Sequence, residues 1–93
     1  MKAIWNDQII AESDKTIQIE GNHYFPKDSI KQAFFKASET HTSCPWKGQA
    51  SYYTLVVAGK ENKDAAWFYE TPSALAKGIK DHIAFWKGVK VGE

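Results

Sequence analysis

Hydrophobic and polar residues alternate along much of this chain, a pattern typical of strands that bury one face. The segment 16–20 alternates strictly and places Ile17 and Ile19 on the same face. The segment 51–58 is rich in Tyr and Val and is the strongest strand prediction. A return strand over 65–70 follows a charged hairpin loop over 59–64. Shorter strands are predicted over 3–6, 8–13, 23–25 and 84–91, the last one interrupted by Gly88. Asn6-Asp7 is predicted as a tight turn between the first two.

Two segments carry helix signals. The first helix is predicted to begin at Asp28 or Ser29, which can cap it, and to run through Ala37. The second begins where Thr71 is followed by proline, because a hydroxyl cap and a proline at the first helical position favour a helix start. The apolar stripe of this second helix is predicted to consist of Leu75, Ile79 and Ile83. Between the first helix and the strong strand, residues 38–49 are predicted to form a polar loop.

Composition excludes several classes of protein. In 93 residues the formal net charge is +1, and every basic residue is lysine. The chain has no arginine side chain to make paired hydrogen bonds with bases or phosphates, and it has little excess positive charge. Both facts argue against specific nucleic-acid binding. Aromatic residues make up 14% of the chain, which excludes disorder. No apolar run approaches the roughly 20 residues that span a bilayer, so we expect no membrane partner. A single cysteine allows no internal disulfide and favours a cytoplasmic location.

The segment 42–53, Thr-Ser-Cys-Pro-Trp-Lys-Gly-Gln-Ala-Ser-Tyr-Tyr, resembles the T-x-C-P-x-K-G-x-A-x-Y signature of the bacterial domain-of-unknown-function family 427. Residues 11–13, 24–26 and 66–72 fit the family in the same order, so the resemblance covers roughly residues 3–91. It implies a β fold similar to the β-tent domains, with two small sheets and an aromatic-lined pocket. The resemblance does not imply an activity, because none is established for the family.

A nucleotidyltransferase label attached to this family finds no support in the residues. Nucleotidyl transfer needs paired carboxylates for its metal ions, and a glycine-rich loop or arginine clamp for the phosphates. The chain has no D-x-D pair and no arginine. Relatives often carry arginine after the Tyr-Phe-Pro segment, where this chain has Lys27. We therefore predict no such activity from the sequence.

Three residues are candidates for catalysis. Cys44 is a potential nucleophile with His41 as its base, and Glu12 with His41 is a potential acid–base pair. The alternative for Cys44 is a buried thiol that anchors the loop, which Pro45 favours because proline removes a backbone N–H that would stabilise a thiolate. A zinc site from His41 and Cys44 would have only two of its four ligands in sequence. We expect no metal and no cofactor.

The candidate ligand-binding residues are a lysine and several aromatic side chains. Lys47 is predicted to lie exposed at the tip of a rigid turn between Pro45 and Gly48, where it either contacts an anion or is simply solvated. Tyr52 and Trp67 form one aromatic wall if their strands pair as a hairpin. Aromatic residues serve equally well in a core and in a ligand cage. The full predicted ligand-binding set is Tyr24, Trp46, Lys47, Tyr52 and Trp67.

Together these observations predict a small antiparallel, mainly β domain over residues 1–93 with two short helices. Its pocket is bounded by the 44–48 turn and floored by Tyr52 and Trp67, with Glu12 and Lys47 as polar contacts. The favoured function is a binding module for a small polar or flat ligand, or for a peptide end. A hydrolase or transferase that uses Cys44 or the Glu12/His41 pair, and a protein-interaction subunit, are the alternatives. The sequence leaves the oligomeric state open.

Overall fold

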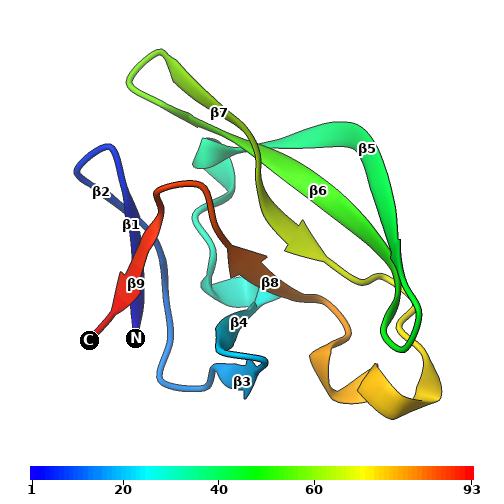
Figure 1. Cartoon of the computed structure of the whole chain (residues 1–93). Coiled ribbons are helices and arrows are strands. Elements are labelled where there is room, and N and C mark those ends of the chain that lie inside the picture. The colour runs from blue at the N-terminus through cyan, green and yellow to red at the C-terminus, as the bar shows by residue number, and fades with distance from the viewer.

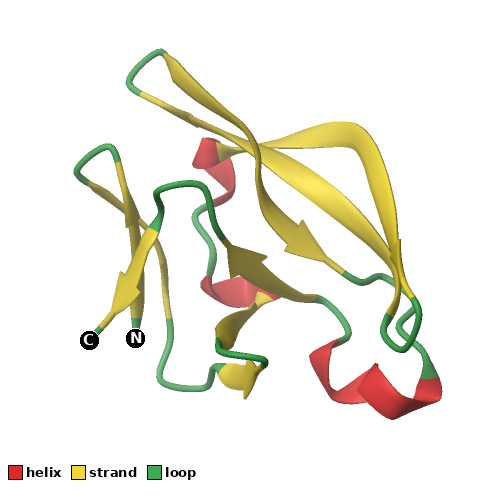
Figure 2. Ribbon diagram, in the orientation of Figure 1, coloured by secondary structure: helices red, strands yellow, loops and turns green.

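Strands make up most of the chain in the computed structural model, which describes residues 1–93 apart from the side chain of Leu75. Three short 3-10 helices lie between strands (Figure 2). In chain order the elements are β1 (Lys2–Trp5), β2 (Gln8–Glu12), β3 (Ile17–Ile19), β4 (Asn22–Pro26), η1 (Lys27–Ser29), η2 (Gln32–Phe34), β5 (Phe35–Cys44), β6 (Gly48–Val57), β7 (Lys60–Phe68), η3 (Ala74–Ile79), β8 (His82–Phe85) and β9 (Lys90–Gly92).

The strands form two antiparallel sheets, which confirms the prediction of a mainly β fold. The small sheet has the order β2-β1-β9, and the large sheet has the order β3-β4-β8-β7-β6-β5. Because β9 pairs with β1, the two chain ends lie side by side on the small sheet (Figure 1). The long strands β5, β6 and β7 form the strongly twisted part of the large sheet (Figure 1).

The two faces of the large sheet pack into different clusters, because successive side chains of a strand point to opposite faces. One cluster contains Phe25, Leu55, Ile83 and Phe85 and includes Ala3 and Ile10 of the small sheet. The other contains Tyr24, Ala50, Tyr69 and Ala84 and is covered by Ala76 and Ile79 of η3. The small sheet therefore packs against one face, and η3 against the other.

Both predicted helices are present only as short 3-10 segments. The first is divided into η1 and η2 and ends at Phe34, and the residues up to Ala37 already belong to β5. The second begins two residues later than expected, with Ser73 in place of Thr71 at its N-cap. Of its predicted apolar stripe, Ile79 is buried under the sheet, Ile83 belongs to β8, and the side chain of Leu75 lies outside the described residues. Short segments like these satisfy few backbone hydrogen bonds, so tertiary contacts decide their form.

The predicted polar loop over 38–49 is wrong for most of its length. Residues up to Cys44 continue β5, and β6 begins at Gly48, so only a three-residue turn separates the two strands. The interruption predicted at Gly88 in the last strand is confirmed: β8 and β9 are separated by a turn in which Lys87 and Gly88 have φ of +53° and +86°. The turn at Asn6-Asp7 is confirmed, with φ of +50° and +63°, values that suit a tight hairpin.

Asp64 ties three strands together where the large sheet bends. Its carboxylate accepts hydrogen bonds from the hydroxyls of Ser38 (2.5 Å) and Thr40 (2.8 Å) on β5. Its backbone N–H donates to Thr54 Oγ1 of β6, and its carbonyl accepts from Trp86 Nε1. The β5–β6 register shifts between Ala37 and His41, so these side chains replace the interrupted backbone pairing. The hydrogen bonds from Ser38 and then Thr40 hold the pKa of Asp64 below its ordinary value, despite burial.

The lowered pKa of Asp64 predicts an acid-sensitive contribution to stability. A carboxyl with a lower pKa in the folded than in the unfolded state stabilises the fold above its unfolded pKa of about 4, and this is lost as the pH falls through the folded pKa. Asp64→Asn is expected to lower the melting temperature at pH 7 by about 4–8 °C, equivalent to ~1 kcal/mol. Below pH 4 the difference from the parent should shrink. Asp14→Asn, at an exposed position, is the control and should melt like the parent at both pH values.

Candidate functional site

The turn between β5 and β6 is docked against the segment before η3. Cys44 pairs with Gly48 across the turn, and Gly48 has φ of +111°. A Cβ at this glycine would lie 3.4 Å from the carbonyl oxygen of Thr71 and 3.5 Å from the backbone nitrogen of Ser73. These are ordinary van der Waals distances, so the position favours glycine because of its backbone conformation and not because space is lacking.

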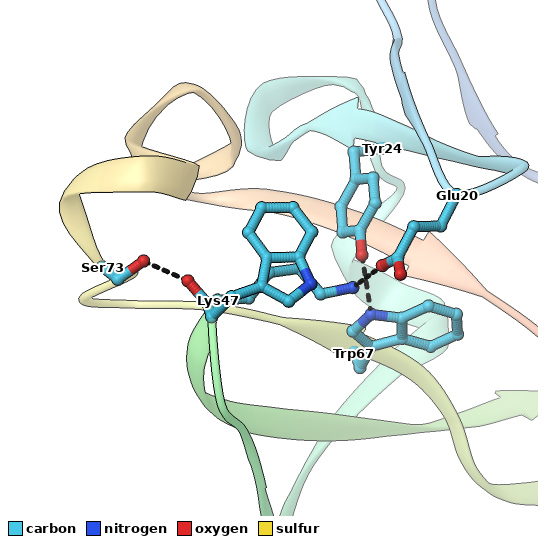
Figure 3. Close-up of polar contacts among 6 residues, drawn as sticks. Glu20, Tyr24, Lys47, Trp67 and Ser73 are labelled. Atoms are coloured by element: carbon cyan, nitrogen blue, oxygen red, sulfur yellow. Dashed lines mark hydrogen bonds and ion pairs between the residues drawn. The ribbon is translucent and has the colours of Figure 1, made fainter.

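Ser73 holds the turn with both of its polar groups. Its hydroxyl donates to the carbonyl of Trp46, as Figure 3 shows, and its backbone N–H donates to the carbonyl of Lys47 at 2.9 Å. The hydroxyl makes no hydrogen bond within its own 3-10 helix. Two of the three carbonyls of the turn thus accept hydrogen bonds from one residue, which fixes the direction in which the side chains of Trp46 and Lys47 leave the backbone.

The predicted exposure of Lys47 is wrong, because the side chain turns inward and only 7% of the residue is exposed. Its ammonium donates to Glu20 Oε1 at 2.5 Å (Figure 3). The same ammonium lies 5.3 Å from the ring centroid of Trp46 and 5.7 Å from that of Tyr69. The sequence predicted Glu12 as the second polar contact of the pocket, but Glu12 is exposed on β2. The carboxylate that contacts Lys47 is Glu20, in the turn between β3 and β4.

The surroundings of Lys47 stabilise its charged form. Burial lowers the pKa of Lys47, but the hydrogen bond to Glu20, with the nearby Tyr24 and Tyr69, outweighs burial and raises the pKa above its ordinary value. The pKa of Tyr69 is also raised, mainly by burial, although the charge of Lys47 opposes this. At neutral pH the site therefore holds a paired ammonium beside the neutral phenol of Tyr69, and Lys47 is not available as an amine nucleophile.

An aromatic pocket of about 180 Å³ adjoins this ammonium. Tyr52 on β6 pairs directly with Trp67 on β7, as the predicted hairpin required. Trp67 meets Trp86 edge to face at 6.0 Å. Behind the wall, Trp67 Nε1 donates to the hydroxyl of the fully buried Tyr24 at 3.2 Å (Figure 3). The residues that line the pocket are Lys47, Tyr52, Trp67, Tyr69 and Trp86.

The structure brings together part of the predicted ligand-binding set. Lys47, Tyr52 and Trp67 line the pocket, whereas Tyr24 supports Trp67 from behind and Trp46, 36% exposed, covers the ammonium of Lys47. Two residues of the site were missed by sequence reasoning. Trp86 follows β8 directly, and Glu20 lies in a turn with φ of +54°. Neither position carries a local signal, since both reach the site through pairing of distant strands.

The three candidate catalytic residues do not converge. His41 and Cys44 are three residues apart on β5, so their side chains point to opposite faces of the sheet. His41 Nδ1 lies 3.2 Å from Ser51 Oγ on one face, and Cys44 packs against the aromatic cluster on the other. Glu12 is exposed on β2, in the small sheet. Neither the Cys44/His41 pair nor the Glu12/His41 pair is assembled.

The described residues contain neither a cluster of metal-binding side chains nor a helix that could span a membrane. Within this part of the chain, no group of three or more His, Cys, Asp or Glu side chains is arranged to hold a metal ion. No helix among the same residues has the length and apolar character needed to cross a membrane.

Comparison with known proteins assigns a family but no activity. The model of a family described as a domain of unknown function, DUF427, matches residues 1–93. The match extends over every element of the fold, including the turn and the aromatic pocket. No curated protein matches the chain.

The burial of Lys47 predicts that this side chain contributes to stability. Lys47→Ala should lower the free energy of unfolding by about 1–3 kcal/mol, because it removes the packed aliphatic stem as well as the ion pair. Lys47→Met retains most of the stem and should lose less than half as much. Glu20 remains more than half exposed and can be hydrated in both variants. Urea denaturation measures both losses, and an alanine variant as stable as the parent would contradict the buried arrangement.

The turn predicts opposite effects at two glycines. Gly48→Ala should destabilise the protein by about 1–2 kcal/mol, because alanine resists the φ of +111° at this position. Gly78→Ala is the matched control: no atom lies within 4 Å of the added Cβ, and the position has no positive φ. This second variant should melt at or above the parent temperature. Equal melting temperatures for the two variants would show that the turn does not hold residue 48 at the positive φ described.

Proposed function

We propose that this chain, which belongs to the DUF427 family, is a binding domain that holds a small flat ligand in its aromatic pocket. The observation that carries the proposal is the wall of four aromatic side chains beside a buried, paired ammonium. Aromatic walls bury flat rings by offset or edge-to-face stacking. An opening of about 180 Å³ suits one such ring and not a large cofactor.

The pocket is rigid, which favours binding. Tyr52 is held by a 2.8 Å hydrogen bond between its hydroxyl and Thr42 Oγ1. Trp67 is held by Tyr24, and Trp86 donates its indole N–H to the carbonyl of Asp64. A ligand that enters between these side chains does not have to order them first, so less conformational entropy is lost on binding.

The charge of the site favours a neutral, electron-rich ring over an anion. The ammonium of Lys47 is already neutralised by Glu20, so an anionic ligand would have to compete with a hydrogen-bonded carboxylate. A ring face presented to the ammonium would instead extend the contacts that Trp46 and Tyr69 already make with it. The ring can belong to a free small molecule or to an aromatic residue at a peptide end.

An enzymatic role for Cys44, His41 or Glu12 is not part of this proposal, since these side chains are not brought together. A cytoplasmic location, expected from the single cysteine, is part of it.

Indole is a suitable probe, because it is flat, neutral and electron-rich. In a titration followed by proton–nitrogen NMR, indole should shift the side-chain N–H signals of Trp67 and Trp86 and leave that of Trp5 unchanged. Trp86→Ala removes one wall and should weaken the binding of indole about threefold to tenfold, the equivalent of one aromatic contact.

Trp46→Ala is the matched control, because Trp46 is similarly exposed and does not line the pocket. It should bind indole within about twofold of the parent. Melting curves of both variants establish that they are folded. Unchanged Trp67 and Trp86 signals at saturating indole, or equal loss in the two variants, would overturn the proposal.

A further inference from the structure

The opposite face of the large sheet carries a second and larger cavity, of about 340 Å³. Its floor is apolar and includes Tyr53, Phe68 and Ile83. The rings of Tyr53 and Phe68 are stacked, with centroids 4.8 Å apart and an interplanar angle of 24°. A volume of this size falls at the lower end of the range for small-molecule sites.

Polar side chains enclose this floor on the β5–β6 side. Ser51 is only 8% exposed, and its hydroxyl lies 3.2 Å from His41 Nδ1. His41 and Ser51 face each other across the two strands. This pair offers hydrogen-bonding groups beside the apolar floor, which is the arrangement that orients a small ligand.

Three charged residues from distant segments lie at the other side of the cavity, namely Lys27, Glu70 and Asp81. Backbone pairing brings them together. Tyr69 forms a bridge with Lys80, and the N–H of Asp81 donates to the carbonyl of Tyr69, so Glu70 and Asp81 are neighbours. Pro26 pairs with His82, which places Lys27 beside the same two carboxylates.

None of these three charged side chains takes part in an ion pair among the described residues. Among the residues that the structure describes, the ion pairs join Lys36 to Glu61 and Lys47 to Glu20. Glu70, Asp81 and Lys27 are exposed and form no ion pair within 4.0 Å in the same set. With two carboxylates and one lysine, this side of the cavity has an excess of negative charge next to the aromatic faces of the floor.

We propose that this cavity is a separate binding site for a small ammonium compound that carries an aromatic or apolar group. The ammonium would be held by Glu70 and Asp81 through charge-assisted hydrogen bonds. The apolar group would lie on the floor formed by Tyr53 and Phe68, whose ring faces also attract a cation. If the ligand also has a carboxylate, as a free amino acid does, the ammonium of Lys27 would donate hydrogen bonds to it.

Three probes of similar size test this assignment: 2-phenylethylamine has the ammonium, 3-phenylpropionate has the carboxylate, and phenylalanine has both. In NMR titrations of the whole chain, 2-phenylethylamine should shift the backbone amides of Ser51, Phe68 and Asp81. 3-Phenylpropionate should bind at least about tenfold more weakly. Phenylalanine binding tighter than 2-phenylethylamine identifies an amino acid as the ligand, and weaker binding identifies a simple amine. Equal binding of 3-phenylpropionate and 2-phenylethylamine would overturn the proposal.

Charge-removing variants supply the second test. Glu70→Gln with Asp81→Asn should weaken the binding of 2-phenylethylamine about tenfold or more, and asparagine tolerates the φ of +59° at position 81. The control combines Glu39→Gln with Asp14→Asn, which changes the net charge equally at exposed positions that do not line the cavity. Equal affinity in the two double variants would overturn the proposal. Trp86→Ala should bind 2-phenylethylamine like the parent, so this site and the aromatic pocket are tested independently.

Discussion

The ion pair between Lys47 and Glu20 is the contact on which the arrangement of the site depends. It joins the β5–β6 turn to the β3–β4 turn, 27 residues apart in sequence. A buried ammonium is stable only when its charge is compensated. The side chain of Lys47 can therefore turn inward only if the carboxylate of Glu20 lies within hydrogen-bond distance of its ammonium. Trp46 and Tyr69 then pack against the ammonium. Ser73 holds the backbone of the turn in the position that this packing needs.

The large sheet separates two kinds of chemistry because adjacent residues on a strand face opposite directions. Tyr52 and Trp67 line the aromatic pocket, whereas their neighbours Tyr53 and Phe68 form the floor of the other cavity, which Tyr52 also borders. Two thin layers cover the sheet incompletely, one from the small sheet and one from η3. The uncovered ends of both faces are where the two pockets lie.

Strained backbone conformations occur at three residues that help to set these positions. Glu20, Asp64 and Asp81 all have positive φ although they carry a Cβ, and each lies at a contact between distant strands. Such conformations cost free energy and persist only where surrounding contacts enforce them. For Asp64 those contacts are the hydroxyls of Ser38 and Thr40. For Asp81 it is the backbone hydrogen bond to Tyr69.

The sequence by itself determined most of the strands other than β5, the hairpin that pairs Tyr52 with Trp67, and the glycine turn at Gly48, because alternation and turn chemistry act over a few residues. The tertiary structure decided the rest. Whether Lys47 lies in water or in the interior depends on Glu20, and whether 35–44 is loop or strand depends on pairing with β6. Trp86 and Glu20 lie in the site because distant strands pair, and no pattern of neighbouring residues in the sequence predicts that pairing. Long-range contacts supplied the free energy that overrode the weak helix signals, and only folding brings those contacts together.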